Sequence, residues 1–293
     1  MKYPEFFDEN LRAIDAALDR RMPPLGTPPP SIHEAMRYSV FAGGKRLRPM
    51  LCLESARIFS ADVTAALDAG CALEFIHTYS LIHDDLPALD NDDLRRGKPT
   101  NHKKFGEANA ILAGDALLTL AFETLSTVAI APERRVELIH EVATAAGTRD
   151  GMVGGQVADL EAEGKPVTPD QLAYIHKSKT AALIRASVVA GAYCGSAAKP
   201  DIERLRAFGN SIGWAFQVVD DILDVEESSA ALGKTAGKDQ AQQKATYPAL
   251  FGLAKSHEFA KELASRALAE IESYGPRAAH LRELAEFLVV RRA

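Results

Sequence analysis

Apolar residues recur at helical spacing along almost the whole chain. Between residues 205 and 223 the apolar positions step by three or four: Leu205, Phe208, Ile212, Phe216, Val219 and Leu223. That spacing places them on one face of a long helix. Residues 108–127, rich in Ala and Leu, predict a second apolar helix. Because no convincing series of alternating, β-branched segments bounded by tight turns accompanies them, the pattern predicts an all-α fold.

Capping residues mark where several helices should begin. Ser31–Glu34 has the pattern of a capping box, and Thr168–Gln171 has the same pattern with Pro169 at the first helical position. No internal repeat and no second domain boundary interrupts the helical pattern. We therefore expect one domain over residues 1–293, built as a single bundle of about ten mostly antiparallel helices.

The sequence becomes chemically specific at an acidic cluster around Pro87. Asp84, Asp85 and Asp90 surround this proline, which should end a helix over residues 69–85 because proline disfavours helix in the preceding residue and cannot continue the hydrogen-bond ladder. Asp84 and Asp85 then lie at a helix C-terminus, where the macrodipole disfavours each anion by about 0.3–1 kcal/mol.

A second acidic cluster, at residues 220–224, is expected to end the helix over residues 205–223. Asp220 and Asp224 are four residues apart and share a helix face, so they repel each other. One such cluster is equally well explained as a solvated helix end, but two favour bound cations. Carboxylates without Cys or His suit hard ions, and Mg²⁺ typically takes one or two carboxylates together with substrate phosphates. The two clusters indicate a diphosphate held between helix ends through Mg²⁺.

Basic residues accompany the acidic clusters. Lys45 and Arg48 flank glycines in a loop that could grip one diphosphate, although such a loop is usually a solvated surface. Arg95 and Arg96 directly follow the first acidic cluster, and mutual ion pairing is the alternative to a site that binds both metal and diphosphate. His77 lies one to two helical turns before that cluster, and a lone histidine in an apolar helix is more often a core residue.

Composition excludes several classes of function. With 47% hydrophobic residues, 25% charged residues and a net charge of −6, nothing suggests a nucleic-acid surface or a polybasic membrane patch. Gly233–Thr235 lacks the earlier glycine of a P-loop. Residues 1–11 lack the apolar core of a signal peptide, and the two longest apolar runs are broken by Asp115 and Arg185. We expect a cytoplasmic protein without a membrane span, and three separated cysteines fit a reducing compartment.

Six ordered motifs resemble those of the trans-isoprenyl diphosphate synthases, most closely the bacterial farnesyl diphosphate synthase (geranyltranstransferase) type. They are GGKRLRP at 43–49, HTYSLIHDDLPALDNDDLRRGKPT at 77–100, GGQ at 154–156, HKSKT at 176–180, FQVVDDILD at 216–224 and GKTAGKD at 233–239. No motif position departs from the family in chemical type. The resemblance implies that the helices surround a central cavity.

The resemblance also implies a role for each matching side chain. Asp84, Asp90 and Asp220 would bind Mg²⁺, with Asp85 and Asp224 as supporting partners. Isopentenyl diphosphate would be held by Lys45, Arg48, His77 and Arg96. The allylic diphosphate would be held by Arg95, Lys179, Lys234 and Lys244, with Lys238 as a competitor for the last position. Thr180 and Gln217 would line the reacting carbons, and Gln156 would support the site.

The implied reaction joins isopentenyl diphosphate head to tail with dimethylallyl or geranyl diphosphate. Mg²⁺, as three ions with diphosphate bound, and the cationic side chains would stabilise the departing diphosphate so that the allylic C–O bond ionises. The double bond of isopentenyl diphosphate attacks the carbocation, and the released diphosphate is the expected base for the proton. A dry apolar pocket must keep water from the cation. The resemblance further implies a homodimer.

Product length is expected to depend on Tyr79 and Ser80, five and four residues before Asp84. At about 1.5 Å per residue, Tyr79 lies roughly 7.5 Å deeper along the helix and could form the pocket floor. An aromatic residue at this position, with the two-residue spacer in the acidic motif, implies by resemblance a C15 product, (2E,6E)-farnesyl diphosphate. The alternative is that Tyr79 only packs the core.

Three alternative functions remain open. A geranyl or geranylgeranyl diphosphate synthase would differ only in product length. A class I terpene cyclase would share the fold and metal chemistry but would not need the second diphosphate site at residues 43–49 and Arg96. A non-catalytic regulatory subunit of a prenyl synthase would be expected to lose aspartates that this chain retains.

Overall fold

The computed structural model describes residues 6–230 and 245–289. The helices are α1 (Phe7–Arg21), α2 (Pro30–Val40), α3 (Leu47–Arg57), α4 (Thr64–Asp84), α5 (Asn101–Phe105), α6 (Glu107–Ser126), α7 (Pro132–Ala146), α8 (Met152–Ala162), α9 (Pro169–His176), α10 (Ala182–Cys194), α11 (Lys199–Ala230), α13 (Tyr247–Phe251), α14 (Leu253–Ile271) and α15 (Ala279–Val289). A π-helix, η1 (Lys177–Ala181), and a 3₁₀ helix, η2 (Glu272–Ala278), complete them. The expected all-α class is confirmed, and the strands in the described ranges are the two-residue pair β1 (Leu94–Arg95) and β2 (Lys98–Pro99).

The predicted helix starts have mixed outcomes. At Thr168 the capping box is present, because the Thr168 hydroxyl accepts from the Gln171 amide and the Gln171 side chain accepts from the Thr168 amide. The capping box predicted at Ser31 is wrong. Helix α2 begins two residues earlier than that cap predicts, at Pro30 with Pro29 as its N-cap, because the fixed φ of proline suits the first helical position.

The two helices that carry the acidic clusters end differently relative to those clusters. Helix α4 stops at Asp84 with Asp85 as its C-cap, as Pro87 predicts. The expectation that α11 ends at the second cluster is wrong, because the helix continues to Ala230. No proline or glycine interrupts residues 225–230, so the helix has no local reason to stop. The macrodipole argument therefore holds for the first cluster only.

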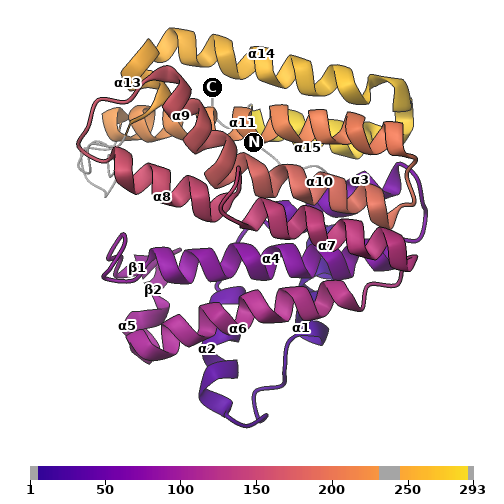
Figure 1. Cartoon of the computed structure of the whole chain (residues 1–293), viewed down its shortest axis with the longest axis vertical. Helices are drawn as coiled ribbons and strands as arrows, with labels where there is room; N and C mark the ends of the chain where they lie inside the picture. The colour runs from indigo at the N-terminus through magenta and orange to yellow at the C-terminus, as the bar shows by residue number, and fades with distance from the viewer. Residues whose placement is uncertain (1–5, 231–244, 290–293) are drawn as a thin grey trace.

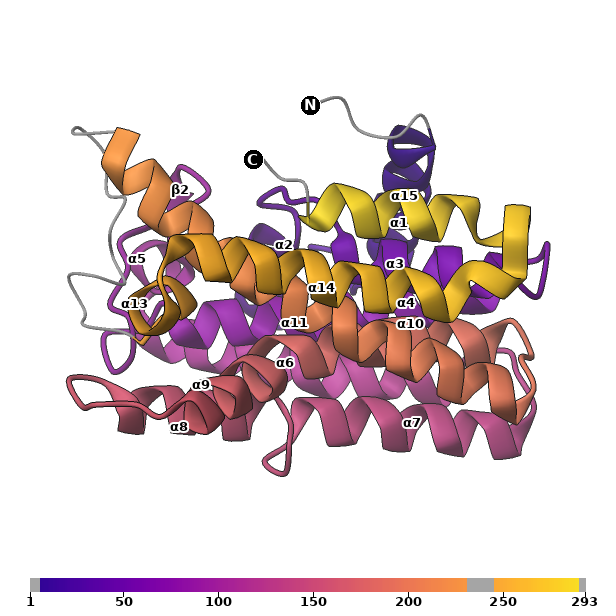
Figure 2. The same cartoon turned by 90° about the horizontal axis from the view of Figure 1, so that it is seen from above.

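Helix α10 lies between α4 and α11 in the bundle (Figure 1). Helix α4 packs against α3, α6 and α10, and α11 packs against α10 and α14. All residues of α10 except Arg185 are buried. Seen from above, α14 and α15 lie over the inner helices (Figure 2). The largest buried side chains include Phe75 on α4 and Phe208 on α11. This core fixes the two helices that carry the acidic clusters.

One described helix, α6, has the length and composition of a membrane span. Core helices of soluble proteins pass the same test, and here α6 packs along the length of α4. Of its most apolar window, 39% is buried within the chain. The helix is thus integrated in the bundle and still presents apolar residues outward.

Candidate active site

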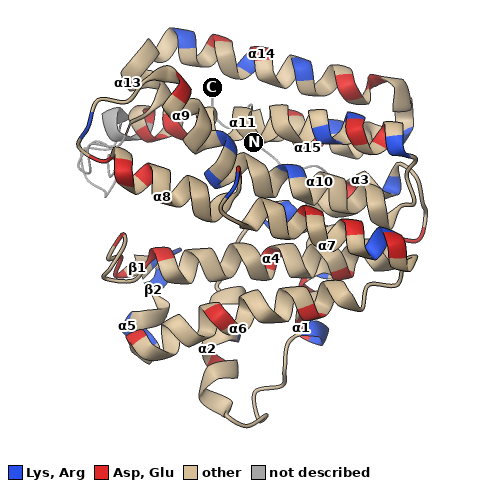
Figure 3. Cartoon of the chain, viewed as in Figure 1, with Lys and Arg blue, Asp and Glu red and all other residues tan. Residues whose placement is uncertain are grey.

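The ends of α4 and α11 that carry the acidic clusters lie on the same side of the molecule, next to the β1–β2 hairpin (Figures 1 and 3). Burial raises the pKa of Asp84 to about 6, and the neighbouring Asp90 adds to the rise against the opposing charge of Lys179. Crowded carboxylates of this kind are stabilised by a bound cation. The donor set fits Mg²⁺, since it contains carboxylate oxygens and no thiolate.

The acidic side chains do not form a complete metal cage on their own. Among the described residues, no group of three or more His, Cys, Asp or Glu side chains is arranged to hold a metal ion. Mg²⁺ typically takes one or two carboxylates from the protein, and substrate phosphate oxygens are further ligands. Asp84, Asp90, Asp220 and Asp224 would hold the ions together with diphosphate, and the ions would supply charge to the departing group.

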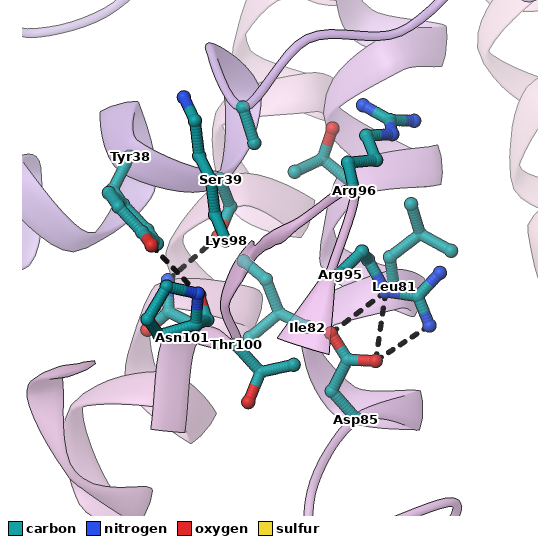
Figure 4. Close-up of a pocket in the computed structure, with 13 residues that line it drawn as sticks. Tyr38, Ser39, Leu81, Ile82, Asp85, Arg95, Arg96, Lys98, Thr100 and Asn101 are labelled. Atoms are coloured by element: carbon teal, nitrogen blue, oxygen red, sulfur yellow. Dashed lines mark hydrogen bonds and ion pairs between the residues drawn. The ribbon is translucent and has the colours of Figure 1, made fainter. Parts of the chain in front are cut away.

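Asp85 differs from the other predicted metal-binding residues in that it holds an arginine. Its carboxylate is buried and accepts from Arg95, with contacts of 2.6 Å to Nη2 and 2.8 and 2.9 Å to Nε (Figure 4). Burial raises the pKa of Asp85, and the Arg95 contact opposes the rise. The pair orients the Arg95 guanidinium beside the first acidic cluster, so in this structure Asp85 supports the diphosphate-binding side of the site.

Hydrogen bonds join the hairpin that carries Arg95 and Arg96, and the residues just beyond it, to α2. The Tyr38 hydroxyl donates to the carbonyl of Pro99 at 2.8 Å. Just beyond the hairpin, the buried Asn101 amide donates to the Ala35 carbonyl at 2.9 Å and to the Ser39 hydroxyl at 2.8 Å (Figure 4). Helix α2 therefore sets the position of both arginines.

The basic loop before α3 is built around an unusual backbone. Arg46 has a left-handed conformation with φ of 48°, and its buried guanidinium contacts Asp15 and Glu74, each at 2.9 Å. Gly44 has φ of 129°, and a Cβ there would lie 2.6 Å from Nη1 of Arg96. Glycine thus lets Arg96 lie against the loop, where it donates to the Gly43 carbonyl.

All four residues predicted to hold isopentenyl diphosphate line one cavity of about 450 Å³, which also includes Gly43, Gly44, Glu74 and Phe216. The four are Lys45, Arg48, His77 and Arg96. Burial lowers the pKa of Arg48 to about 10, so it stays protonated at neutral pH, and its Nε finds no hydrogen-bond partner among the described residues. Burial and the nearby arginines hold the pKa of His77 well below its usual range. The buried Nε of Arg48, a charged donor, is suited to an anionic ligand.

A second cavity, of about 350 Å³, adjoins the first through Arg48 and His77, which line both. Its polar end contains Asp84, Gln156, Lys179 and Thr180, and its deeper wall contains Tyr79 and Ser80. Three apolar residues of α8 face it at helical spacing, Val153, Val157 and Leu160, and each is between 38% and 49% exposed. A diphosphate at the polar end would extend an apolar chain along this wall.

Lys179 and Thr180 are presented by the π-helix η1. The wider π turn places both side chains at the site, as π-helical turns in proteins often do at functional positions. Lys179 Nζ contacts the Asp159 carboxylate at 2.6 Å, and the Thr180 hydroxyl donates to Oε1 of Gln217 at 2.7 Å. Gln217 in turn donates through Nε2 to Asp221 at 3.1 Å. Thr180, Gln217 and Asp221 therefore form one hydrogen-bonded chain, and Lys179 pairs separately with Asp159.

Two hydrogen-bond partners of the predicted catalytic residues, Asp159 and Asp221, were not predicted from the sequence. Asp221 is buried, accepts from the Tyr247 amide at 2.9 Å and lies 3.3 Å from Nε2 of His176. Burial lowers the pKa of His176 to about 3, so its ring is neutral. Asp159 lies three residues after Gln156 on α8, and this helical spacing is the signal that could have identified it.

The structure brings ten of the predicted residues together around the two adjoining cavities: Lys45, Arg48, His77, Tyr79, Ser80, Asp84, Arg96, Gln156, Lys179 and Thr180. Asp85, Asp90, Arg95, Gln217, Asp220 and Asp224 line neither of these two cavities. Lys234, Lys238 and Lys244 lie outside the described residues, so their roles stay predictions.

Comparison with known proteins agrees with the helical bundle, its two adjoining cavities and its acidic helix ends. The chain belongs to the polyprenyl synthetase family, whose profile matches residues 29–279. A chloroplastic geranylgeranyl pyrophosphate synthase of Capsicum annuum is 50% identical over 290 residues, covering 98% of this chain and 78% of that protein. Farnesyl diphosphate synthase of Geobacillus stearothermophilus is 48% identical over 286 residues, covering 96% of each chain.

A solved structure gives the same assignment. The FPP/GFPP synthase from Zymomonas mobilis superposes with a TM-score of 0.86 at 42% identity, covering 97% of each chain. The protein is thus a prenyltransferase of the trans-prenyl diphosphate synthase class, an enzyme class that uses prenyl diphosphate substrates and Mg²⁺.

Proposed function

We propose that this enzyme is a farnesyl diphosphate synthase. It condenses isopentenyl diphosphate with dimethylallyl diphosphate and then with geranyl diphosphate, and releases diphosphate at each step. The observation that carries the C15 assignment is the position of Tyr79, whose ring is only 7% exposed in the wall of the apolar cavity, five residues below Asp84. A bulky ring at that depth limits how far the product can grow.

The chain's own residues account for the steps of the reaction. Arg48, His77 and Arg96, together with Lys45, bind the diphosphate of isopentenyl diphosphate. Lys179, with Arg95, holds the allylic diphosphate where negative charge develops as the C–O bond breaks. Mg²⁺, as three ions in our proposal, supplies further positive charge to that leaving group. The apolar α8 wall keeps water from the allylic cation, and the released diphosphate takes the proton.

A geranylgeranyl diphosphate synthase is the second candidate. It is favoured by the 50% identity to the Capsicum annuum enzyme. The two candidates share every diphosphate-binding and metal-binding residue, and they differ in how far the apolar cavity extends beyond Tyr79.

We also infer that two copies of the chain associate through α6. Ile111 and Leu112 on this helix are 45% and 55% exposed, and an apolar helix face of this kind is typical of a subunit interface. A cytoplasmic location belongs to the same proposal, because Cys52, Cys71 and Cys194 are buried free thiols that fit a reducing compartment.

Product analysis by mass spectrometry tests the proposal. The purified protein is given labelled isopentenyl diphosphate with dimethylallyl or geranyl diphosphate, with and without Mg²⁺. We expect a C15 diphosphate that forms only with the metal. A C20 end product would favour the second candidate and reject the C15 assignment, and no elongation from any starter would reject the synthase function.

A further inference from the structure

A glycine outside the catalytic motifs lies against the wall of the apolar cavity. Gly114 is buried in the middle of α6, where glycine is unfavourable by roughly 0.5–1 kcal/mol relative to alanine. A Cβ built on Gly114 would lie 2.1 Å from Nε2 of His83 and 2.5 Å from its Cδ2. The glycine therefore leaves room for the imidazole of His83, which projects from α4 toward α6.

His83 is held on this side of the cavity by two contacts. Its Nε2 lies 3.0 Å from the carbonyl oxygen of Ile111 on α6. Its ring meets the Tyr79 ring edge to face, with centroids 5.8 Å apart. His83 and Tyr79 are four residues apart on α4, so they share a helix face, and both line the apolar cavity. The imidazole forms the wall immediately above the proposed floor.

We propose that Gly114 is a specificity-determining residue for product length, because it allows His83 to withdraw from the path of the growing chain. This inference rests on the proposed function and concerns the same cavity. The α6 backbone closes one side of the imidazole and Tyr79 lies below it, so a side chain at position 114 displaces the ring toward the cavity. The displaced ring takes the space of the second isoprene unit and shortens the product.

The test compares Gly114→Ala with the wild type in the conversion of dimethylallyl and of geranyl diphosphate. We expect Gly114→Ala to accumulate the C10 product and to lower kcat/KM for geranyl diphosphate, relative to dimethylallyl diphosphate, by at least about tenfold. Gly70→Ala is the matched control, because it makes the same change in α4, where the new Cβ would meet Pro49 at 3.1 Å instead of the cavity wall. Its product mixture should match the wild type.

The double variant His83→Ala/Gly114→Ala, compared with His83→Ala, tests whether the imidazole is the obstacle. This pair remains informative if Gly114→Ala alone fails to fold, because the clash is removed with the ring. We expect the two variants to give the same product lengths. An unchanged product mixture in Gly114→Ala, longer products, or a C10 shift that persists without the imidazole would overturn the inference. Wild-type elongation, measured in parallel, separates these outcomes from failure of the synthase function.

Discussion

Replacing Tyr79 by alanine should lengthen the product. Tyr79 is buried in the wall of the apolar cavity, where His83 lies one helical turn closer to Asp84 on α4. On the proposed C15 assignment, we expect the wild type to refuse farnesyl diphosphate as a starter, because its last isoprene unit would overlap the ring. In Tyr79→Ala that unit enters the space that the ring leaves.

The expected rise in kcat/KM for farnesyl diphosphate can be worked out from the size of the isoprene unit that enters this space. An isoprene unit has five carbons, and each buried CH₂ contributes about 0.8 kcal/mol, so full burial would contribute up to about 4 kcal/mol. Because about 1.4 kcal/mol is a factor of ten in rate, the upper limit is roughly 10³-fold in kcat/KM for farnesyl diphosphate. Partial filling of the space lowers this, and we expect a rise of about 10- to 10³-fold.

Steady-state kinetics with farnesyl diphosphate as starter, with products identified by mass spectrometry, measures this effect. Tyr79→Phe is the control, since it keeps the ring and should still stop at C15. Truncating a buried ring costs up to about 3–5 kcal/mol of stability, so the unfolding midpoint of each variant is recorded alongside. A folded Tyr79→Ala enzyme that elongates geranyl diphosphate but still refuses farnesyl diphosphate would refute the floor assignment.

Three further predictions concern the residues that hold the site in place. Glu74→Gln should lower the free energy of unfolding by about 3 kcal/mol in urea titrations, because the buried Arg46 loses its buried carboxylate partner. Asp221→Asn should lower kcat/KM for the allylic substrate at least about tenfold, because its side chain cannot accept from both Gln217 and the Tyr247 amide while facing His176. The third is a pH effect. Because the pKa of His176 falls to about 3 on folding, from about 6.5, the unfolded chain alone takes up the proton below pH 6.5. The stability of the wild type relative to His176→Gln should therefore fall by about 2 kcal/mol between pH 7 and pH 5.

Each of these predictions has an outcome that contradicts it. Asp15→Asn removes the other, more exposed partner of Arg46 and should cost less than about 1 kcal/mol, so equal losses for Glu74→Gln and Asp15→Asn would speak against the buried pair. Unchanged kinetics in Asp221→Asn would show that Gln217 does not depend on it. A stability difference between wild type and His176→Gln that stays constant with pH would contradict the neutral buried ring.

Local sequence patterns predicted the helix boundaries well where a proline or a capping box marked them. Pro87 correctly ended α4, and the Thr168 capping box correctly began α9. The end of α11 was wrong because the prediction took the acidic cluster as a stop, whereas carboxylates within a helix are tolerated when packing against α10 and α14 holds it in place. The predicted start of α2 was wrong by two residues, since Pro30 could begin the helix without the serine cap.

The sequence predicted those site residues that belong to clusters of charged side chains. The acidic cluster at Pro87 pointed to Asp84, and the cations beside glycines pointed to Lys45 and Arg48, all of which line the two cavities. The residues that position them gave no such signal. Asn101 acts through a carbonyl and a hydroxyl on α2, more than sixty residues earlier in the chain, and only the folded structure brings these groups together.

Asp220 and Asp221 show how helix geometry separates a residue that the sequence predicts from one that it does not. The two residues are adjacent in sequence, so their side chains point about 100° apart around α11. Asp220 lies on the same face as Asp224, whereas Asp221 turns inward, is buried and holds Gln217 and the Tyr247 amide. One acidic motif thus has two faces: Asp220 and Asp224 lie on the face that we propose binds cations, and Asp221 on the next face holds Gln217. Asp220→Asn should therefore change the Mg²⁺ dependence of the reaction, whereas Asp221→Asn should lower kcat/KM for the allylic substrate and leave that dependence unchanged.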